Sequence, residues 1–143
     1  MLPAYRLMNG DTGPRQQSTV TCGSACLTVA RMLVDREFAH WISTGEGARP
    51  GSPRGDSPAE RFAAYERIVH RRTNTLRLGR GGLNIPWPRM LGTPPWGAKW
   101  ELEFGAARHG TDYDITLVRP LSADRLVAVF EHVNSVVAEG MPG

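Results

Sequence analysis

The sequence is poor in lysine, in cysteine and in long apolar stretches. Lys99 is the only lysine among 17 basic residues, and all the others are arginine. No apolar run approaches the roughly 20 residues that a membrane-spanning helix needs. The N-terminus lacks the basic-then-apolar order of a signal peptide. We therefore expect a protein that has no membrane segment and resides in the cytoplasm.

The scarcity of cysteine argues against a metal site. Cys22 and Cys26 are the only two cysteines, and a disulfide between residues one turn apart in a helix is geometrically awkward. A zinc site would need two further ligands, which no Cys-x-x-Cys pair or nearby histidine supplies. The glycine-rich stretch 79–82 neither follows a strand nor opens a helix, as a phosphate-binding loop would. We therefore expect no metal and no cofactor, with Cys26 as a buried packing residue.

Length and composition fit one globular domain over residues 1–143. The chain has 41% hydrophobic and 22% charged residues, and its formal net charge is +3. Five arginines gather between positions 67 and 80, so a nucleic-acid patch is one interpretation. No aromatic residues are interleaved with them, which favours the alternative of a solvated helix face and loop. We therefore treat nucleic-acid binding as the less favoured alternative.

Apolar periodicity predicts a largely helical chain. The predicted helices cover 22–34, 36–43, 58–72, a short segment from about 95 to 104, and 122–139. In the first helix, Cys26, Leu27 and Leu33 belong to the face expected to be buried. Ser57 and Glu60 form a capping box for the third helix. The only convincing strand is 113–119.

One segment has the residues expected of a catalytic site. Gln16 lies six residues before Cys22, which opens an apolar helix in the run Cys-Gly-Ser-Ala-Cys-Leu. Unpaired amides and the helix dipole stabilise a thiolate at such a position. A glutamine just upstream can donate to the oxygen that becomes anionic when the thiolate attacks a carbonyl. We interpret Cys22 as a nucleophile and Gln16 as an oxyanion donor, although neighbouring Gln17 leaves the register open.

This segment resembles the active-site segment of the C39-like cysteine peptidases, a papain-like family. The resemblance implies an α+β, papain-like fold and thiol-dependent hydrolysis of a peptide or amide bond in a peptide or protein substrate. It also implies a histidine base and an acidic partner. His109 and Asp124 have a spacing similar to that of the family's pair. Alternatively, the histidine lies beyond Gly143, because His109 precedes a turn and Asp124 is placed where a helix start favours an acid.

The helical prediction leaves little sheet for a papain-like fold. One strand at 113–119 cannot cover the apolar faces of three helices, because isolated β-structure is marginally stable. We expect the chain to be mostly the helical part of the domain, with strands supplied from beyond Gly143, by a partner chain or by a second copy. The alternative to an active peptidase is a catalytically inactive, peptidase-like binding module.

Overall fold

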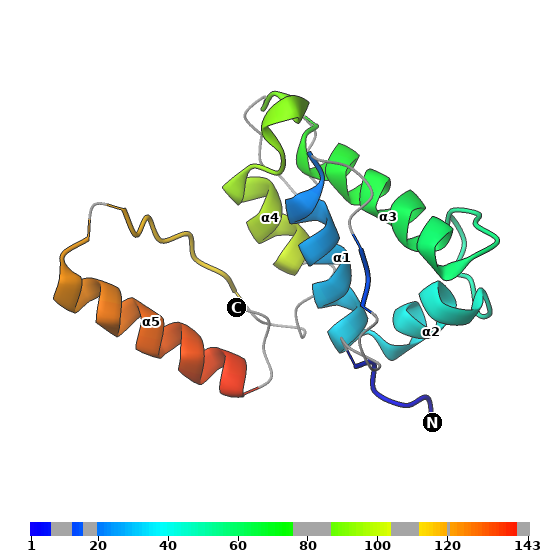
Figure 1. The fold of residues 1–143 in the computed structure, drawn as a ribbon, viewed down its shortest axis with the longest axis horizontal. Coiled ribbons are helices and arrows are strands. Elements are labelled where there is room, and N and C mark those ends of the chain that lie inside the picture. The colour runs from blue at the N-terminus through cyan, green and yellow to red at the C-terminus, as the bar shows by residue number, and fades with distance from the viewer. Residues whose placement is uncertain (7–12, 16–19, 76–86, 104–111, 120, 140–143) are drawn as a thin grey trace.

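The fold is a group of packed helices. The computed structural model describes residues 1–6, 13–15, 20–75, 87–103, 112–119 and 121–139. Its elements are α1 (Cys22–Val34), α2 (Arg36–Thr44), α3 (Pro58–Thr73), the 3₁₀ helix η1 (Arg89–Leu91), α4 (Pro95–Glu101) and α5 (Ala123–Ala138). Helices α1 to α4 pack together, and α5 lies apart from them (Figure 1). No helix among the described residues is long and apolar enough to cross a membrane.

The core lies where α1, α2 and α3 meet. Phe38, Trp41 and Ile42 of α2 are buried, as their spacing predicts. The rings of Phe38 and Tyr65 meet edge to face with centroids 4.6 Å apart, an arrangement that adds to the burial of apolar area. The remaining core side chains come from all three helices: Ala25, Leu27, Met32, Ala39, Phe62 and Val69.

Caps fix where these helices begin and end. Asp35 ends α1 and starts α2, and its side chain accepts a hydrogen bond from the Phe38 amide at 3.0 Å. At the start of α3, the Ser57 hydroxyl accepts from the Glu60 amide at 3.2 Å, which confirms half of the expected capping box. The Glu60 carboxylate accepts from the Asp56 amide, one residue before the N-cap. These local bonds explain why the sequence predicts the helix boundaries closely.

The buried face of α1 differs from the predicted one. Cys26 is exposed, and Leu33 is 45% exposed. Ser24 and Thr28 are fully buried in their place. Thr28 can be buried because its hydroxyl donates to the Ser24 carbonyl at 2.8 Å, so no polar group is left unsatisfied. The expectation that Cys26 is a buried packing residue is therefore wrong.

The expected α+β, papain-like fold is also wrong for the part of the chain that the structure describes. Those residues form helices and irregular segments and contain no strand. The predicted strand 113–119 is irregular, and most of its residues are exposed. A strand exists only by pairing with another strand, and no described segment pairs with this one. The alternation of apolar residues at Tyr113, Ile115 and Leu117 favours a strand, but among the described residues the segment has no partner strand with which to form a sheet.

Helix α5 forms as predicted but does not bury its apolar face. None of its residues is buried, and Phe130 is 66% exposed. Figure 1 shows α5 on the opposite side of the picture from α2 and α3. The core therefore consists of α1 to α4 and their connections among the described residues.

Candidate functional site at the start of α1

Cys22 is the first residue of α1 and is exposed. No acidic residue lies in the first turn of α1. Thr21 occupies the N-cap, but its side chain makes no capping bond to the first-turn amides. The Thr21 side chain therefore does not occupy the first-turn amides, and a helix N-terminus favours an anion. The geometry agrees with the sequence prediction that the thiol opens the helix.

A buried carboxyl from α3 explains why Thr21 does not cap α1. The Thr21 hydroxyl donates to the Glu66 carboxyl, and these side chains are 4% and 1% exposed. Sequence analysis missed Glu66 because a charged residue on a helix is expected to face water. Its spacing of four residues from both Phe62 and His70 was the available signal, since this spacing places all three on one helix face.

The glycine after Cys22 has a packing role. A methyl group on Gly23 would lie 2.8 Å from the Cβ of Thr93, in the segment that leads into α4. The Thr93 hydroxyl is 3.1 Å from the Ser24 hydroxyl, which makes a second link between these segments. From sequence, a glycine next to the nucleophile is expected to keep the backbone open for a substrate. The structure instead places Thr93 against it.

The other histidines that could serve as a base are dispersed. A histidine late in an amphipathic helix among arginines is expected to face solvent, but His70 is buried on α3, and its Nδ1 lies 3.4 Å from the Asn74 side-chain amide. His40 lies 3.6 Å from Glu46, and His132 is exposed on α5. Within the described part of the chain, no hydrogen bond or ion pair links a histidine to Cys22.

The other predicted site residues do not complete a catalytic group. Gln16 and His109 lie outside the described residues. Asp124 is exposed in the first turn of α5, and the start of α5 lies far from α1 in Figure 1. The structure therefore brings Cys22 together with Thr21, Glu66 and Thr93, and leaves Asp124 apart.

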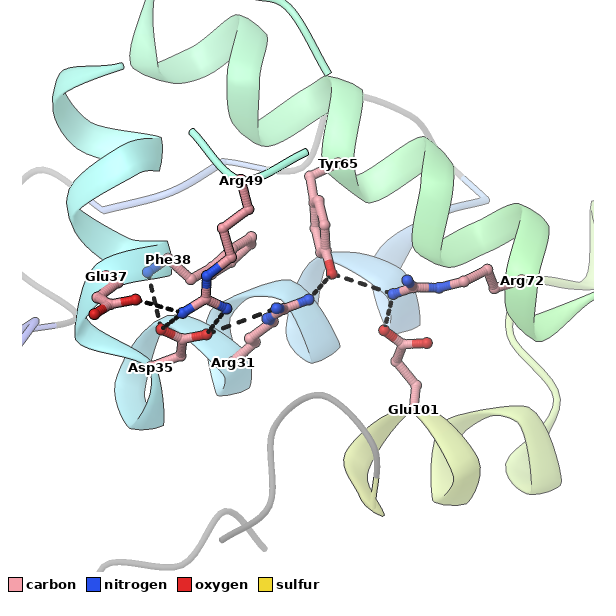
Figure 2. A network of polar contacts seen from close by, with 8 residues as sticks. All are labelled: Arg31, Asp35, Glu37, Phe38, Arg49, Tyr65, Arg72 and Glu101. Atoms are coloured by element: carbon pink, nitrogen blue, oxygen red, sulfur yellow. Dashed lines mark hydrogen bonds and ion pairs between the residues drawn. The ribbon is translucent and has the colours of Figure 1, made fainter. Parts of the chain in front are cut away.

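A second polar cluster joins α1, α3 and α4 (Figure 2). Arg31 and Arg72 both donate to the Tyr65 hydroxyl, the second at 3.2 Å. Every arginine in the cluster also has a carboxylate partner. The ion pairs are Arg31 with Asp35, Arg49 with Asp35 and Glu37, and Arg72 with Glu101.

This cluster is balanced in charge. The hydrogen bonds to Glu37 and Asp35 raise the pKa of Arg49 above its usual value. A cavity of about 220 Å³ lies beside it, lined by Arg31 and Tyr65 among others. Because the guanidinium groups already face carboxylates, the cluster ties the helices together and offers no unbalanced charge to a ligand.

The structure describes only part of the predicted arginine patch. Arg67 and Arg71 are exposed on α3, while Arg72 pairs with Glu101. Arg77 and Arg80 lie outside the described residues. Among the residues that the structure does describe, no cluster of histidine, cysteine and carboxylate side chains has the geometry to hold a metal ion.

Comparisons with models of known protein families, with curated proteins and with solved structures find no match to this chain. The resemblance to C39-like peptidases therefore rests on the residues from Gln16 to Leu27 alone.

Proposed function

We propose that the chain is a thiol-dependent hydrolase of peptide or amide bonds, with Cys22 as nucleophile, as its resemblance to C39-like peptidases implies. The observation that carries the proposal is the position of Cys22. Its exposed side chain lies on the first residue of α1, beside amides that the N-cap side chain leaves uncapped. Helix amides in this arrangement favour a negative charge on sulfur or on a nearby oxygen.

The reaction is acyl transfer to sulfur and then to water. The Cys22 thiolate attacks the carbonyl carbon, and the resulting oxyanion accepts hydrogen bonds from first-turn amides and the Gln16 side chain. Collapse of this intermediate breaks the carbon–nitrogen bond, and the amine leaves with the proton that the base took from the thiol. Water then hydrolyses the thioester. His109 and Asp124 are the proposed base and its partner.

One observation favours the second candidate, a peptidase-like binding module without activity. Two histidines of the described residues belong to helices that pack on α1, and both have other partners. His40 lies beside Glu46, and His70 lies beside Asn74. A thiol without a base can still bind or react slowly, but it does not turn over an amide. The two functions share Cys22 and differ in whether a base reaches it.

Competitive alkylation separates these functions. Limiting iodoacetamide at pH 7, followed by mass spectrometry, compares Cys22 with Cys26, which is also exposed and lies one turn along the same helix. If Cys22 is an activated nucleophile, it reacts at least about tenfold faster than Cys26. Equal rates would support the inactive module.

A peptide-cleavage assay is the second test of the proposed function. We expect Cys22→Ala and His109→Ala to abolish thiol-dependent cleavage in a mixed peptide library, while the matched control Cys26→Ser retains it. Activity that survives Cys22→Ala would contradict the proposal. Full activity in His109→Ala would leave Cys22 as nucleophile but exclude His109 as the base.

A further inference from the structure

A larger cavity lies at the opposite end of α1 from Cys22. It has a volume of about 730 Å³, within the range of small-molecule sites. Met32 lines it, ten residues after Cys22, and therefore about 15 Å along the helix axis at 1.5 Å per residue. We call this space the N-terminal cavity, because the segments 2–6 and 13–15 form one of its walls. Figure 1 shows the start of the chain beside the end of α1 and the start of α2.

The floor of the N-terminal cavity is apolar. Its deepest side chains are Met32 of α1, Ala39 and Ile42 of α2, and Phe62 of α3, each no more than 4% exposed. These residues belong to the main core, so the floor is held rigidly. An alkyl chain placed there would exchange water for an apolar surface, which is the main source of affinity for such ligands.

The described part of the rim carries arginines. Arg6, Arg15 and Arg36 line it, and none of the described lining residues is an aspartate or a glutamate. His40 also lines the rim and lies 3.6 Å from Glu46. Arg36 and His40 are one turn apart on α2, so they project from the same helix face. The Arg36 guanidinium donates to the Leu2 carbonyl at 3.3 Å, which places it against the N-terminal wall. This contact of Arg36 with a carbonyl differs from the contacts in Figure 2, in which each arginine faces a carboxylate.

The wall also holds a neutral hydrogen-bond donor. Tyr5 is partly buried against the core, and burial raises the pKa of its phenol above the ordinary value. Its hydroxyl therefore stays protonated at neutral pH and can donate to an anion.

We propose that the N-terminal cavity binds a single-chain fatty acid, with its alkyl chain on the Met32–Ile42–Phe62 floor and its carboxylate at Arg36. An apolar floor with a cationic rim matches a ligand that is apolar along its length and anionic at one end. Guanidinium binds carboxylate in a bidentate geometry, and among the described lining residues no carboxylate competes for it. This site is separate from Cys22 and does not depend on the thiol chemistry.

Isothermal titration calorimetry with dodecanoate, below its micelle concentration, tests the proposal on the full chain. We expect one molecule bound per chain, and affinity that rises by up to about fourfold per methylene from octanoate to dodecanoate. Dodecyltrimethylammonium has the same chain and the opposite charge, so it should bind at least about tenfold more weakly. Absence of dodecanoate binding, or equal binding of the cationic amphiphile or of dodecanol, would overturn the proposal.

Variants of Arg36 test whether this residue binds the carboxylate of dodecanoate. Arg36→Glu should weaken dodecanoate binding about tenfold or more, while Arg36→Lys, which keeps the charge but loses the bidentate geometry, should weaken it less than Arg36→Glu does. Arg36 is exposed at the first position of α2, where glutamate suits the helix dipole, so folding should be preserved. Arg67→Glu is the matched control, because Arg67 is exposed on α3 and does not line the cavity. Equal losses in Arg36→Glu and Arg67→Glu would overturn the assignment to Arg36.

Methyl NMR locates the alkyl chain. Dodecanoate should shift the methyl resonances of Met32 and Ile42 and leave those of Val133 unchanged. Val133 lies on the exposed apolar face of α5, which is where non-specific adsorption of an amphiphile would occur. Shifts confined to Val133 would overturn the proposal. Cys22→Ser should bind dodecanoate with unchanged affinity, so failure of the thiol chemistry and failure of the lipid site are distinguishable.

Discussion

At the scale of single residues, Glu66 is the strongest constraint on the site. Its carboxyl is 1% exposed and accepts a hydrogen bond from the Thr21 hydroxyl beside Cys22. A buried polar group is tolerated only when it is hydrogen-bonded, since an unsatisfied one is destabilising by about 1–3 kcal/mol. This single bond therefore connects the stability of the core to the position of the thiol.

We expect Glu66→Ala to lower the free energy of unfolding by about 2–4 kcal/mol, because it leaves a cavity and removes a buried hydrogen bond with the Thr21 hydroxyl. Urea denaturation measures the change. Glu46→Ala serves as control, since Glu46 is exposed in a loop and should change stability by less than about 0.5 kcal/mol. A Glu66→Ala effect as small as that of the control would mean that Glu66 is not buried in solution.

Asp112 allows a test of pH dependence. A hydrogen bond with Glu103, and then the Lys99 ammonium 3.2 Å away, hold the pKa of Asp112 below its usual value. Because the folded-state pKa is lowered, the contact stabilises the protein above the unfolded value near 3.9, and this contribution is lost as the pH falls through the folded pKa. The Asp112 side chain is exposed, so the contribution is small.

Carbon-13 NMR titration of the Asp112 carboxyl should give a midpoint below that of an unfolded aspartate. Lys99→Met should move this midpoint upward, because it removes the neighbouring positive charge. Lys99 is the only lysine, so the variant leaves no other ammonium group except the N-terminus. A midpoint in the native chain at or above the ordinary value would contradict the observed contact.

At the scale of elements, sequence predicts where helices lie better than which faces they bury. The boundaries of α1 and α3 agree with prediction because Cys22, Ser57 and Pro58 carry local signals that need no tertiary contact. The buried face of α1 was predicted only in part. Leu27 is buried as expected, but Cys26 and Leu33 are exposed. Their places are taken by Ser24 and Thr28. Their hydroxyls are satisfied by Thr93 and by the helix itself, partners that periodicity cannot reveal.

Gly97 shows how a contact between elements reverses an ordinary helix rule. Glycine inside a helix usually destabilises by roughly 0.5–1 kcal/mol relative to alanine. Here a methyl group at Gly97 in α4 would lie 2.6 Å from the backbone oxygen of Thr73, at the end of α3. We therefore expect Gly97→Ala to destabilise the protein by about 1–3 kcal/mol, because α4 must move away from α3.

Thermal and urea unfolding measure this change. Ser57→Ala is a useful comparison, because loss of a helix cap is expected to destabilise by about 1 kcal/mol without moving any element. A neutral or stabilising Gly97→Ala would show that α4 is not packed closely on Thr73.

At the scale of the whole molecule, the error in fold class came from the resemblance and from one strand-like segment. The residues themselves predict each α-helix in the described part of the chain, but not the 3₁₀ helix η1. A papain-like sheet was inferred because the Cys22 segment resembles a family that has one, and a segment of a dozen residues constrains only its own helix. Residues 113–119 show that alternation without a partner strand does not produce a sheet.

The core and α5 differ in how much apolar surface they bury, and a pair of phenylalanine-to-alanine substitutions tests this difference. Phe62 on α3 is 4% exposed, and Phe130 on α5 is 66% exposed. We expect Phe62→Ala to lower the free energy of unfolding by about 3–5 kcal/mol, and Phe130→Ala to change it by less than about 0.5 kcal/mol. The residue type and the substitution are identical, so the difference reports burial alone.

Repeating the denaturation across a hundredfold range of protein concentration extends this test to association. A stability that does not change with concentration, together with a neutral Phe130→Ala, means that the apolar face of α5 stays in water. A Phe130→Ala effect above about 1 kcal/mol that grows with concentration would contradict the expected neutrality. It would show that a second copy of the chain covers Phe130, because only association makes stability depend on protein concentration.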